Sequence, residues 1–207
     1  MRRPHRKALM ILLAALVVSG VAVSAVARNS PQHFTLEESC TLPHPSAITL
    51  TLAGTQATVD FSPGGGGEQL ILDAIRAAHT SIRVQAYSFS DRRILRALGA
   101  AKARGVDVEV ILDKTDAESY QHRKSVAALI VAEGIPVWVD ASVRIAHNKV
   151  IVIDGDDLIT GSYNFTYAAA YDNAENLLYL KNARKLAQAY TANFNWRRSC
   201  SRPYAGR

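Results

Sequence analysis

The sequence predicts an α/β fold with a mixed, largely parallel β-sheet that carries helices on both faces. Helix-period and strand-period stretches alternate between about residues 69 and 139, which is typical of crossover connections between parallel strands. The last third changes to two apolar strands joined by a short acidic turn, which indicates a hairpin. The 207 residues, 48% of them apolar, suffice for one domain and exclude a disordered or collagen-like chain.

Each expected element has a local signal. Residues 70–78 place apolar side chains on one helical face, whereas residues 82–86 alternate as a strand does. The next helix begins at a Ser90 or Asp91 cap and ends before Gly105, whose place after the last turn suits a helix stop. The remaining strands are expected over residues 47–52, 57–61, 106–112, 136–139, 149–153, 158–162 and 175–180, and the remaining helices over residues 125–133 and 182–196.

The first 27 residues have the pattern of an export signal. A basic start precedes 20 uncharged residues that end in Ala25-Val26-Ala27, which predicts a cleaved secretory signal. The alternative is an uncleaved anchor, because 20 uncharged residues can span a bilayer. Either way, the basic start stays inside and the domain lies outside the cytoplasm, in the periplasm or the medium. An irregular lead-in (28–45), a single domain (46–200) and a tail (201–207) are expected to follow.

The net charge of +6 says little about a partner. Four of the 24 basic residues lie in the first 27 positions, and the remaining 20 exceed the 18 acidic residues by only two. The charge of the folded part is therefore weak evidence for a nucleic-acid surface.

Cys40 and Cys200 are the two cysteines of the chain. In an oxidising compartment they predict one disulfide that joins the two ends of the domain, worth about 5 kcal/mol by loop entropy. Two free thiols, or a bond between chains, are the alternatives. The cysteines and histidines lack the spacing of a zinc site.

Polar side chains cluster at the predicted hairpin. His147 and Lys149 are two residues apart at a strand start, so they share a face, and Ser162 and Asn164 do the same on the returning strand. Such groups beside an apolar strand are costly unless they satisfy one another or a ligand. Gly161 removes a side chain where a ligand needs to approach the backbone.

The spacing His147-x-Lys149, Asp154, Gly161-Ser162-x-Asn164 resembles the HKD signature of the phospholipase D superfamily, with every position filled. The resemblance extends from about Val59 to Trp196. It is greatest to the short exported bacterial endonucleases that carry one motif per chain. Taken singly, Asp154 has the alternative of making the turn, and Lys149 that of an exposed edge charge.

The resemblance implies a two-step reaction at a phosphodiester. One histidine attacks phosphorus to form a phosphohistidine, and a second protonates the leaving oxygen. Because the chain has one motif, the second histidine is expected from another copy in a homodimer. Lys149, Ser162 and Asn164 are expected to bind the phosphate, Asp154 completes the motif, and no metal or other cofactor is expected. Glu175 is expected to hydrogen-bond the imidazole, the alternative being a solvent-facing charge on an edge strand.

Three functions remain open at this point. The leading hypothesis is a non-specific endonuclease acting on DNA, with RNA as a further candidate. The main alternative is a phospholipase D or phosphatidyl transferase, because the same chemistry cleaves lipid head groups. The third is a catalytically silent module that binds nucleic acid or membrane. A membrane is expected as a partner only if the N-terminal segment stays uncleaved or the substrate is lipid.

Overall fold

A computed structural model describes residues 40–42, 50, 52–64, 66–118 and 125–205. All of these belong to the compact unit of residues 34–207. The predicted signal and most of the lead-in lie outside the described residues, as does most of the strand expected over 47–52. No helix within the described ranges is long and apolar enough to cross a membrane.

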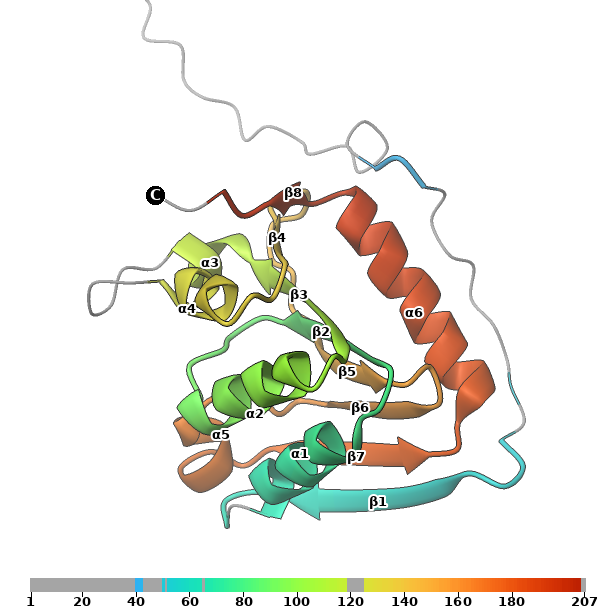
Figure 1. The fold of residues 1–207 in the computed structure, drawn as a ribbon. Coiled ribbons are helices and arrows are strands. Elements are labelled where there is room, and N and C mark those ends of the chain that lie inside the picture. Colours follow the sequence, from blue (N-terminus) through green and yellow to red (C-terminus); the bar gives the residue numbers. More distant parts are fainter. Residues whose placement is uncertain (1–39, 43–49, 51, 65, 119–124, 206–207) are drawn as a thin grey trace, which may run out of the picture. The chain divides into compact units, whose positions relative to one another are not determined.

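Eight strands of the described residues form one mixed sheet in the order β1-β7-β6-β5-β2-β3-β4-β8 (Figure 1). They are β1 (Gln56–Phe61), β2 (Ser81–Ala86), β3 (Asp107–Asp113), β4 (Val137–Asp140), β5 (Lys149–Ile153), β6 (Asp157–Gly161), β7 (Asn176–Lys181) and β8 (Arg202–Pro203). The local signal is strongest in β5, where every residue is buried, whereas β2 and β3 each contain a partly exposed charged side chain, Arg83 and Glu109, among their buried residues.

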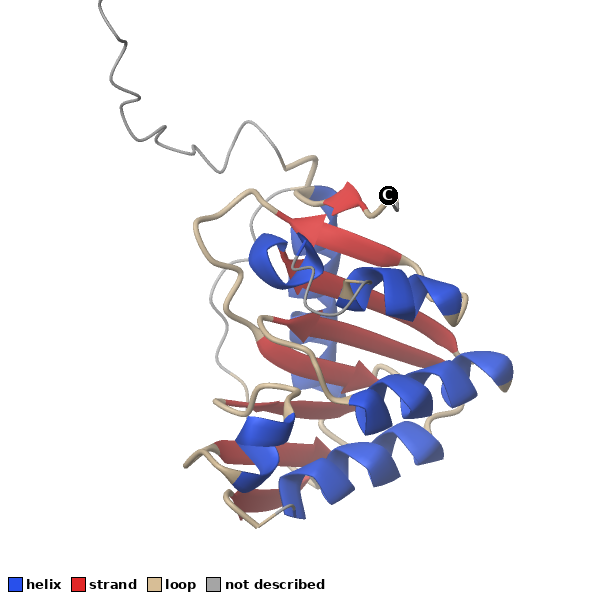
Figure 2. Cartoon of the chain, turned by 90° about the vertical axis from the view of Figure 1, so that its left-hand side faces the viewer, coloured by secondary structure: helices blue, strands red, loops and turns tan. Residues whose placement is uncertain are grey.

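Helices cover both faces of this sheet, as the sequence predicts. The described helices are α1 (Gly66–Ala77), α2 (Arg92–Ala103), α3 (Lys114–Glu118), α4 (Val126–Ala132), α5 (Tyr167–Tyr171) and α6 (Arg184–Ser199). Figure 2 shows α1 and α2 side by side on one face, with α6 crossing behind the strands on the other. The larger core lies under α1 and α2, and a smaller one lies between α6 and strands β5 to β7.

The cap predicted at the start of α2 is present, and Ser125, expected as the first residue of a helix, is a cap as well. The Asp91 side chain accepts from the backbone N–H groups of Arg93 and Ile94 at the start of α2, and Ser125 caps α4 in the same way. Gly105 and Gly134 follow these helices with φ angles of 93° and 74°. Elements α3, α5 and β8 were not predicted, because segments of five, five and two residues are too short to show a period.

The prediction that the sheet is largely parallel is wrong. Only β2–β3 and β3–β4 pair in parallel, whereas the other five pairs of the described sheet are antiparallel. Parallel pairing needs a crossover, which α2 supplies between β2 and β3, and α3 with α4 between β3 and β4. Beyond β4 the chain returns through a short turn and loops, so β5, β6 and β7 pair antiparallel.

Cys40 and Cys200 form a disulfide within the chain. Cys200 ends α6, so the bond ties the N-terminal side of the domain to the last helix. This confirms the intrachain pairing that the sequence left open.

Candidate active site

The predicted catalytic residues lie where β2 ends and β5 begins. These neighbouring strands are antiparallel, with Ala86 opposite Lys149, so the carboxyl end of β2 meets the amino end of β5. The backbone N–H of Tyr87 donates to the carbonyl of Asn148 at 2.8 Å and joins the two strand ends. We call this border of the sheet the catalytic edge.

His147 and Lys149 differ in exposure although they are only two residues apart. The imidazole of His147 is exposed and lies against the Tyr87 ring, with 4.5 Å between ring centroids. Lys149 is only 6% exposed; its Nζ donates to the carbonyl of His147 at 3.0 Å and lies 4.9 Å from the Tyr87 ring centroid. Sequence reasoning did not assign Tyr87 to the site, because only the pairing of β2 with β5 brings it there.

Burial lowers the pKa of Lys149, and the negative charge of Glu175 partly opposes this. Among the described residues the ammonium donates to the His147 carbonyl, which leaves two of its N–H groups for an anion. A buried cation with unused donors at an accessible edge is suited to binding a phosphate oxygen.

The loop before His147 is fixed by buried charged groups. Asp113, at the end of β3, accepts from the Ala146 N–H at 2.7 Å. Asp140, at the end of β4, forms a buried ion pair with Arg197 of α6 and accepts from the Ser142 N–H at 3.1 Å. These contacts hold the loop against the sheet and so set the position of His147.

Ser162 and Glu175 face each other across β6 and β7. The Ser162 hydroxyl donates to Glu175 Oε2 at 2.6 Å, and Asn173 Nδ2 donates to Glu175 Oε1 at 3.1 Å. Ser62 accepts from the Glu175 N–H at 3.0 Å, which fixes the backbone just before β7. Glu175 therefore accepts a hydrogen bond from Ser162, and its negative charge raises the pKa of Lys149. Among the described residues, the Glu175 carboxylate accepts no hydrogen bond from the His147 ring.

Gly161 has a different use from the one expected. Its φ of 153° belongs to a region that other residues rarely adopt, and a Cβ there would lie 2.2 Å from the Asn176 carbonyl oxygen. That carbonyl accepts from the N–H groups of Ser162 and Tyr163. The missing side chain thus admits the backbone of β7, not a ligand, and this close approach positions Ser162.

Asn164 carries an unsatisfied polar atom. Its Oδ1 is buried with no donor within reach among the described residues, and such a group costs about 1–3 kcal/mol. A 180° turn of the amide would present Nδ2 at the same place as a donor. The side chain is therefore available to a ligand or to a second subunit.

Asp154 is not brought together with the other motif residues. It lies at the far end of β5, whose five residues span roughly 17 Å. Its carboxylate accepts from the N–H groups of His79, Thr80 and Ser81 and from the Thr80 hydroxyl. Burial alone would raise the pKa of Asp154, but these hydrogen bonds hold it below the usual value.

Two hollows of the described surface lie outside this site, because neither is lined by His147 or Lys149. Within the described ranges, no three His, Cys, Asp or Glu side chains are grouped so as to hold a metal ion.

Comparison with known proteins identifies the family. Residues 71–198, more than half of the chain, match the family described as Cardiolipin synthase, PLD-like domain. The chain belongs to the phospholipase D superfamily. The family predicted from the motif is thereby confirmed, and the protein is a phosphodiesterase of this superfamily.

Relatives agree in sequence and in fold. The chain is 35% identical over 203 residues to a protein named Phospholipase D from Rickettsia conorii, covering 94% of this chain and 96% of that one. It is 32% identical over 149 residues to Mitochondrial cardiolipin hydrolase of Mus musculus, covering 67% and 66%. Its fold matches the phospholipase D family member Nuc from Salmonella typhimurium with a TM-score of 0.69 and 40% identity, over 73% of this chain and 99% of that one.

Proposed function

We propose that this phosphodiesterase is a metal-independent, non-specific endonuclease whose active site is shared by two subunits. The observation that supports this best is the pairing of an exposed imidazole, His147, with the buried ammonium of Lys149 at one strand border. An accessible nucleophile beside a cation with unused donors suits attack on a phosphodiester.

In the proposed first step, a ring nitrogen of His147 attacks phosphorus. A P–N bond forms, the P–O bond to the leaving strand breaks, and the partner subunit's His147 donates its proton to the leaving oxygen. Water then attacks the phosphohistidine, giving up a proton to the now neutral partner imidazole, and the P–N bond breaks. Lys149 and the Asn164 amide hold the non-bridging oxygens through both steps.

Ser162, Glu175 and Asp154 have supporting roles in this proposal. The Ser162 hydroxyl donates to Glu175 at the same edge. It contributes to phosphate binding when the hydroxyl turns so that its proton points to a phosphate oxygen instead. Glu175 offsets part of the desolvation of the Lys149 ammonium. Asp154 fixes the opposite end of β5 and so acts on the register of the strand rather than on substrate.

A two-fold dimer through the catalytic edge would supply the second histidine. Two large apolar side chains beside the site support such a contact. Phe61, at the end of β1, is 69% exposed and precedes Ser62, which bonds Glu175, while Ile145, two residues before His147, is 45% exposed. A second copy would cover both.

Nucleic acid is favoured as the substrate because the groups around the site are polar. Ser162, Asn173, Glu175 and Asn176 surround the motif, which suits a charged phosphodiester backbone better than the acyl chains of a lipid. The second candidate is a phospholipase, favoured by the names of the Rickettsia and mouse relatives. A silent binding module is disfavoured by the intact motif.

We also propose that the protein is exported, to the periplasm or the medium. The Cys40–Cys200 disulfide supports this, because such bonds persist in oxidising compartments.

The test compares the purified protein on plasmid DNA and on phosphatidylcholine, with EDTA present in both assays. We expect plasmid nicking that persists in EDTA. We expect His147→Ala to lower the nicking rate at least about 10³-fold and to leave the fold intact, because the His147 side chain is exposed. Hydrolysis of the lipid alone would replace the endonuclease by the phospholipase. Comparable nicking by the variant would remove His147 from the mechanism.

A further inference from the structure

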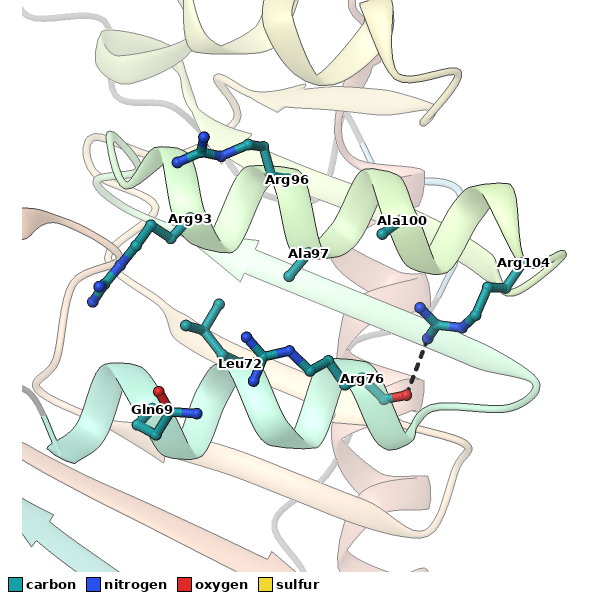
Figure 3. A pocket seen from close by; sticks show the side chains of 8 residues that line it. All are labelled: Gln69, Leu72, Arg76, Arg93, Arg96, Ala97, Ala100 and Arg104. Carbon is teal, nitrogen blue, oxygen red and sulfur yellow. Dashed lines mark hydrogen bonds between the residues drawn. The ribbon is translucent and has the colours of Figure 1, made fainter.

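A groove between α1 and α2 is lined by four arginines (Figure 3). It has a volume of about 390 Å³ and is lined by Gln69, Leu72, Arg76, Arg93, Arg96, Ala97, Ala100 and Arg104. All four arginines are exposed. Figure 3 shows Arg93 and Arg104 reaching from α2 at the two ends of the groove, with Arg76 on the facing helix between them.

The helix dipole favours Arg104, at the C-terminal end of α2, and Arg76, in the last turn of α1, but it does not favour the arginines at the start of α2. Its first turn contains Arg92 and Arg93 and no acid, although cations at a helix N-terminus oppose the helix dipole. No Asp or Glu occurs between Arg92 and Val106 to pair with them along the chain. Charges placed against the local preference of a helix indicate a use outside the helix.

The arginines have unequal roles within the fold. Arg104 donates to three carbonyls at the end of α1, and Arg93 pairs with the buried Glu68. Arg76 pairs with Asp73 on the surface, and Arg96 donates through Nε to a carbonyl of its own helix. Arg76 and Arg96 are thus the two whose replacement would leave the packing of α1 on α2 intact.

A second hollow of about 370 Å³ adjoins the groove through Arg93, which lines both. Its other lining residues are Glu68, Ser90, Asp91, Arg92, Tyr167 and Tyr171. The two tyrosine rings of α5 lie 4.7 Å apart between centroids, and Tyr167 is 66% exposed. Tyr171 is fixed, because its hydroxyl donates to Glu68 and accepts from Arg93, each at 2.9 Å. Tyr167 is the ring left with an open face.

The second hollow is joined to the catalytic edge along the chain by two segments. The loop after β2 contains Tyr87 at the site and Ser90 at the hollow, and the segment after β6 contains Asn164 at the site and Tyr167 at the hollow. The N–H groups of Ser90 and Asp91 donate to the Phe165 carbonyl and fasten the two loops together. The second hollow therefore begins three residues after Tyr87 on one segment and three residues after Asn164 on the other.

We propose that Tyr167 and the arginine groove form a substrate path that takes a single strand of nucleic acid away from the catalytic edge. A base stacks on Tyr167, and the following phosphates lie along Arg93, Arg96 and Arg76. This rests on the proposed endonuclease function and names its substrate class as single-stranded nucleic acid.

Charge spacing and the exposed ring favour nucleic acid over a membrane surface. Arg93 and Arg104 are 11 residues apart, about 16 Å along the helix. At a rise of roughly 3.4 Å per nucleotide, this length is enough for several consecutive phosphates of one strand. The apolar lining side chains, Leu72, Ala97 and Ala100, are short or buried and offer nothing to insert into a bilayer. Stacking on an aromatic ring beside cations is the usual way in which proteins bind single strands without reading sequence.

The experiment measures binding rather than turnover, in the full chain carrying His147→Ala. A short fluorescein-labelled single strand of DNA is titrated by anisotropy at several salt concentrations. Replacing Arg76 and Arg96 together by Gln should weaken binding and lower the salt slope by about 1.4, because each lost phosphate contact on a single strand removes about 0.7. Tyr167→Ala should weaken binding roughly 5- to 150-fold without changing that slope, and Tyr167→Phe should restore it.

Lys185→Gln is the matched control, because Lys185 is an exposed cation on α6 at the opposite face and should have no effect. If the arginine and Tyr167→Ala variants bind the strand as tightly as their parent, the path is overturned. If the same substitutions instead weaken binding only to phosphatidylglycerol vesicles, the groove serves a membrane and the proposal fails as well. A wild-type protein that cuts neither plasmid nor single-stranded DNA would overturn the endonuclease function separately, because the binding assay needs no catalysis.

Discussion

Lys149 shows how one residue's surroundings set its chemistry. Its Nζ is buried against Tyr87 and the His147 carbonyl, so the ammonium is partly desolvated and its pKa lies below the ordinary 10.5. The negative charge of Glu175 partly opposes this shift. A phosphate oxygen bound here would meet a cation with little competing water.

This predicts a pH dependence of anion binding. Sulfate keeps its charge throughout the alkaline range, so weakening of sulfate inhibition at high pH reports loss of the Lys149 proton. We expect that weakening to begin below the titration range of an ordinary lysine, and Lys149→Arg to abolish it, because arginine stays charged. The inhibition constant for sulfate, measured against pH for both proteins, checks this. A constant that is flat to about pH 10 in the wild type would contradict the role of Lys149.

At the scale of elements, Asp154 joins the β5–β6 turn to the connection between α1 and β2. Its φ of 54° is one that Asp and Asn tolerate, and its carboxylate accepts from three consecutive backbone N–H groups. Asp154 lies at the end of β5 next to the start of β2, and the catalytic edge lies at the opposite ends of the same two strands. Asp154 thus fastens β5 to β2 without contacting the catalytic edge.

Asp154→Asn keeps the backbone conformation and removes the charge. We expect the free energy of unfolding to fall by about 1–3 kcal/mol at pH 7, because hydrogen bonds to an ionised group are lost. The folded pKa is lowered, so this contribution is present above the unfolded pKa of about 3.9 and is lost as the pH falls below it. Urea unfolding at pH 7 and at about pH 3 should therefore show the difference between the two proteins narrowing in acid. A difference that is equal at both pH values would show that the charge is not what stabilises the turn.

At the scale of the whole molecule, one chain presents half of the proposed chemistry. The Asn164 oxygen lacks a donor among the described residues. His147 at the catalytic edge is exposed, as are the neighbouring apolar side chains of Phe61 and Ile145. A second copy would cover these groups and add the acid that the mechanism needs.

Subunit mixing tests the shared site. When wild type and His147→Ala are mixed equally and exchange subunits, only about a quarter of two-fold dimers contain two intact histidines. We therefore expect nicking activity of about a quarter of the wild-type level at equal total protein, rather than a half. Sedimentation of the wild type, expected to show a dimer, accompanies the assay. A fully active monomer, or activity that stays at one half, would refute a site built from both subunits.

Local sequence was enough for the parts that depend on neighbours along the chain. The shared face of His147 and Lys149, the Asp91 cap and the apolar periods of the longer elements could be predicted, because a few adjacent residues determine this backbone geometry. The motif also identified the superfamily, because its residues lie on one hairpin.

Contacts between distant segments decided the rest. The direction of β5 beside β2, the approach of Tyr87 to His147, and the pairing of Ser162 with Glu175 join residues from separate strands and loops. The groove between α1 and α2 arises in the same way, since Arg76 and Arg96 become neighbours only when the two helices pack. The physical reason is that periodicity fixes which face of a segment is buried, whereas the sheet order and the packing of whole elements fix what that face meets.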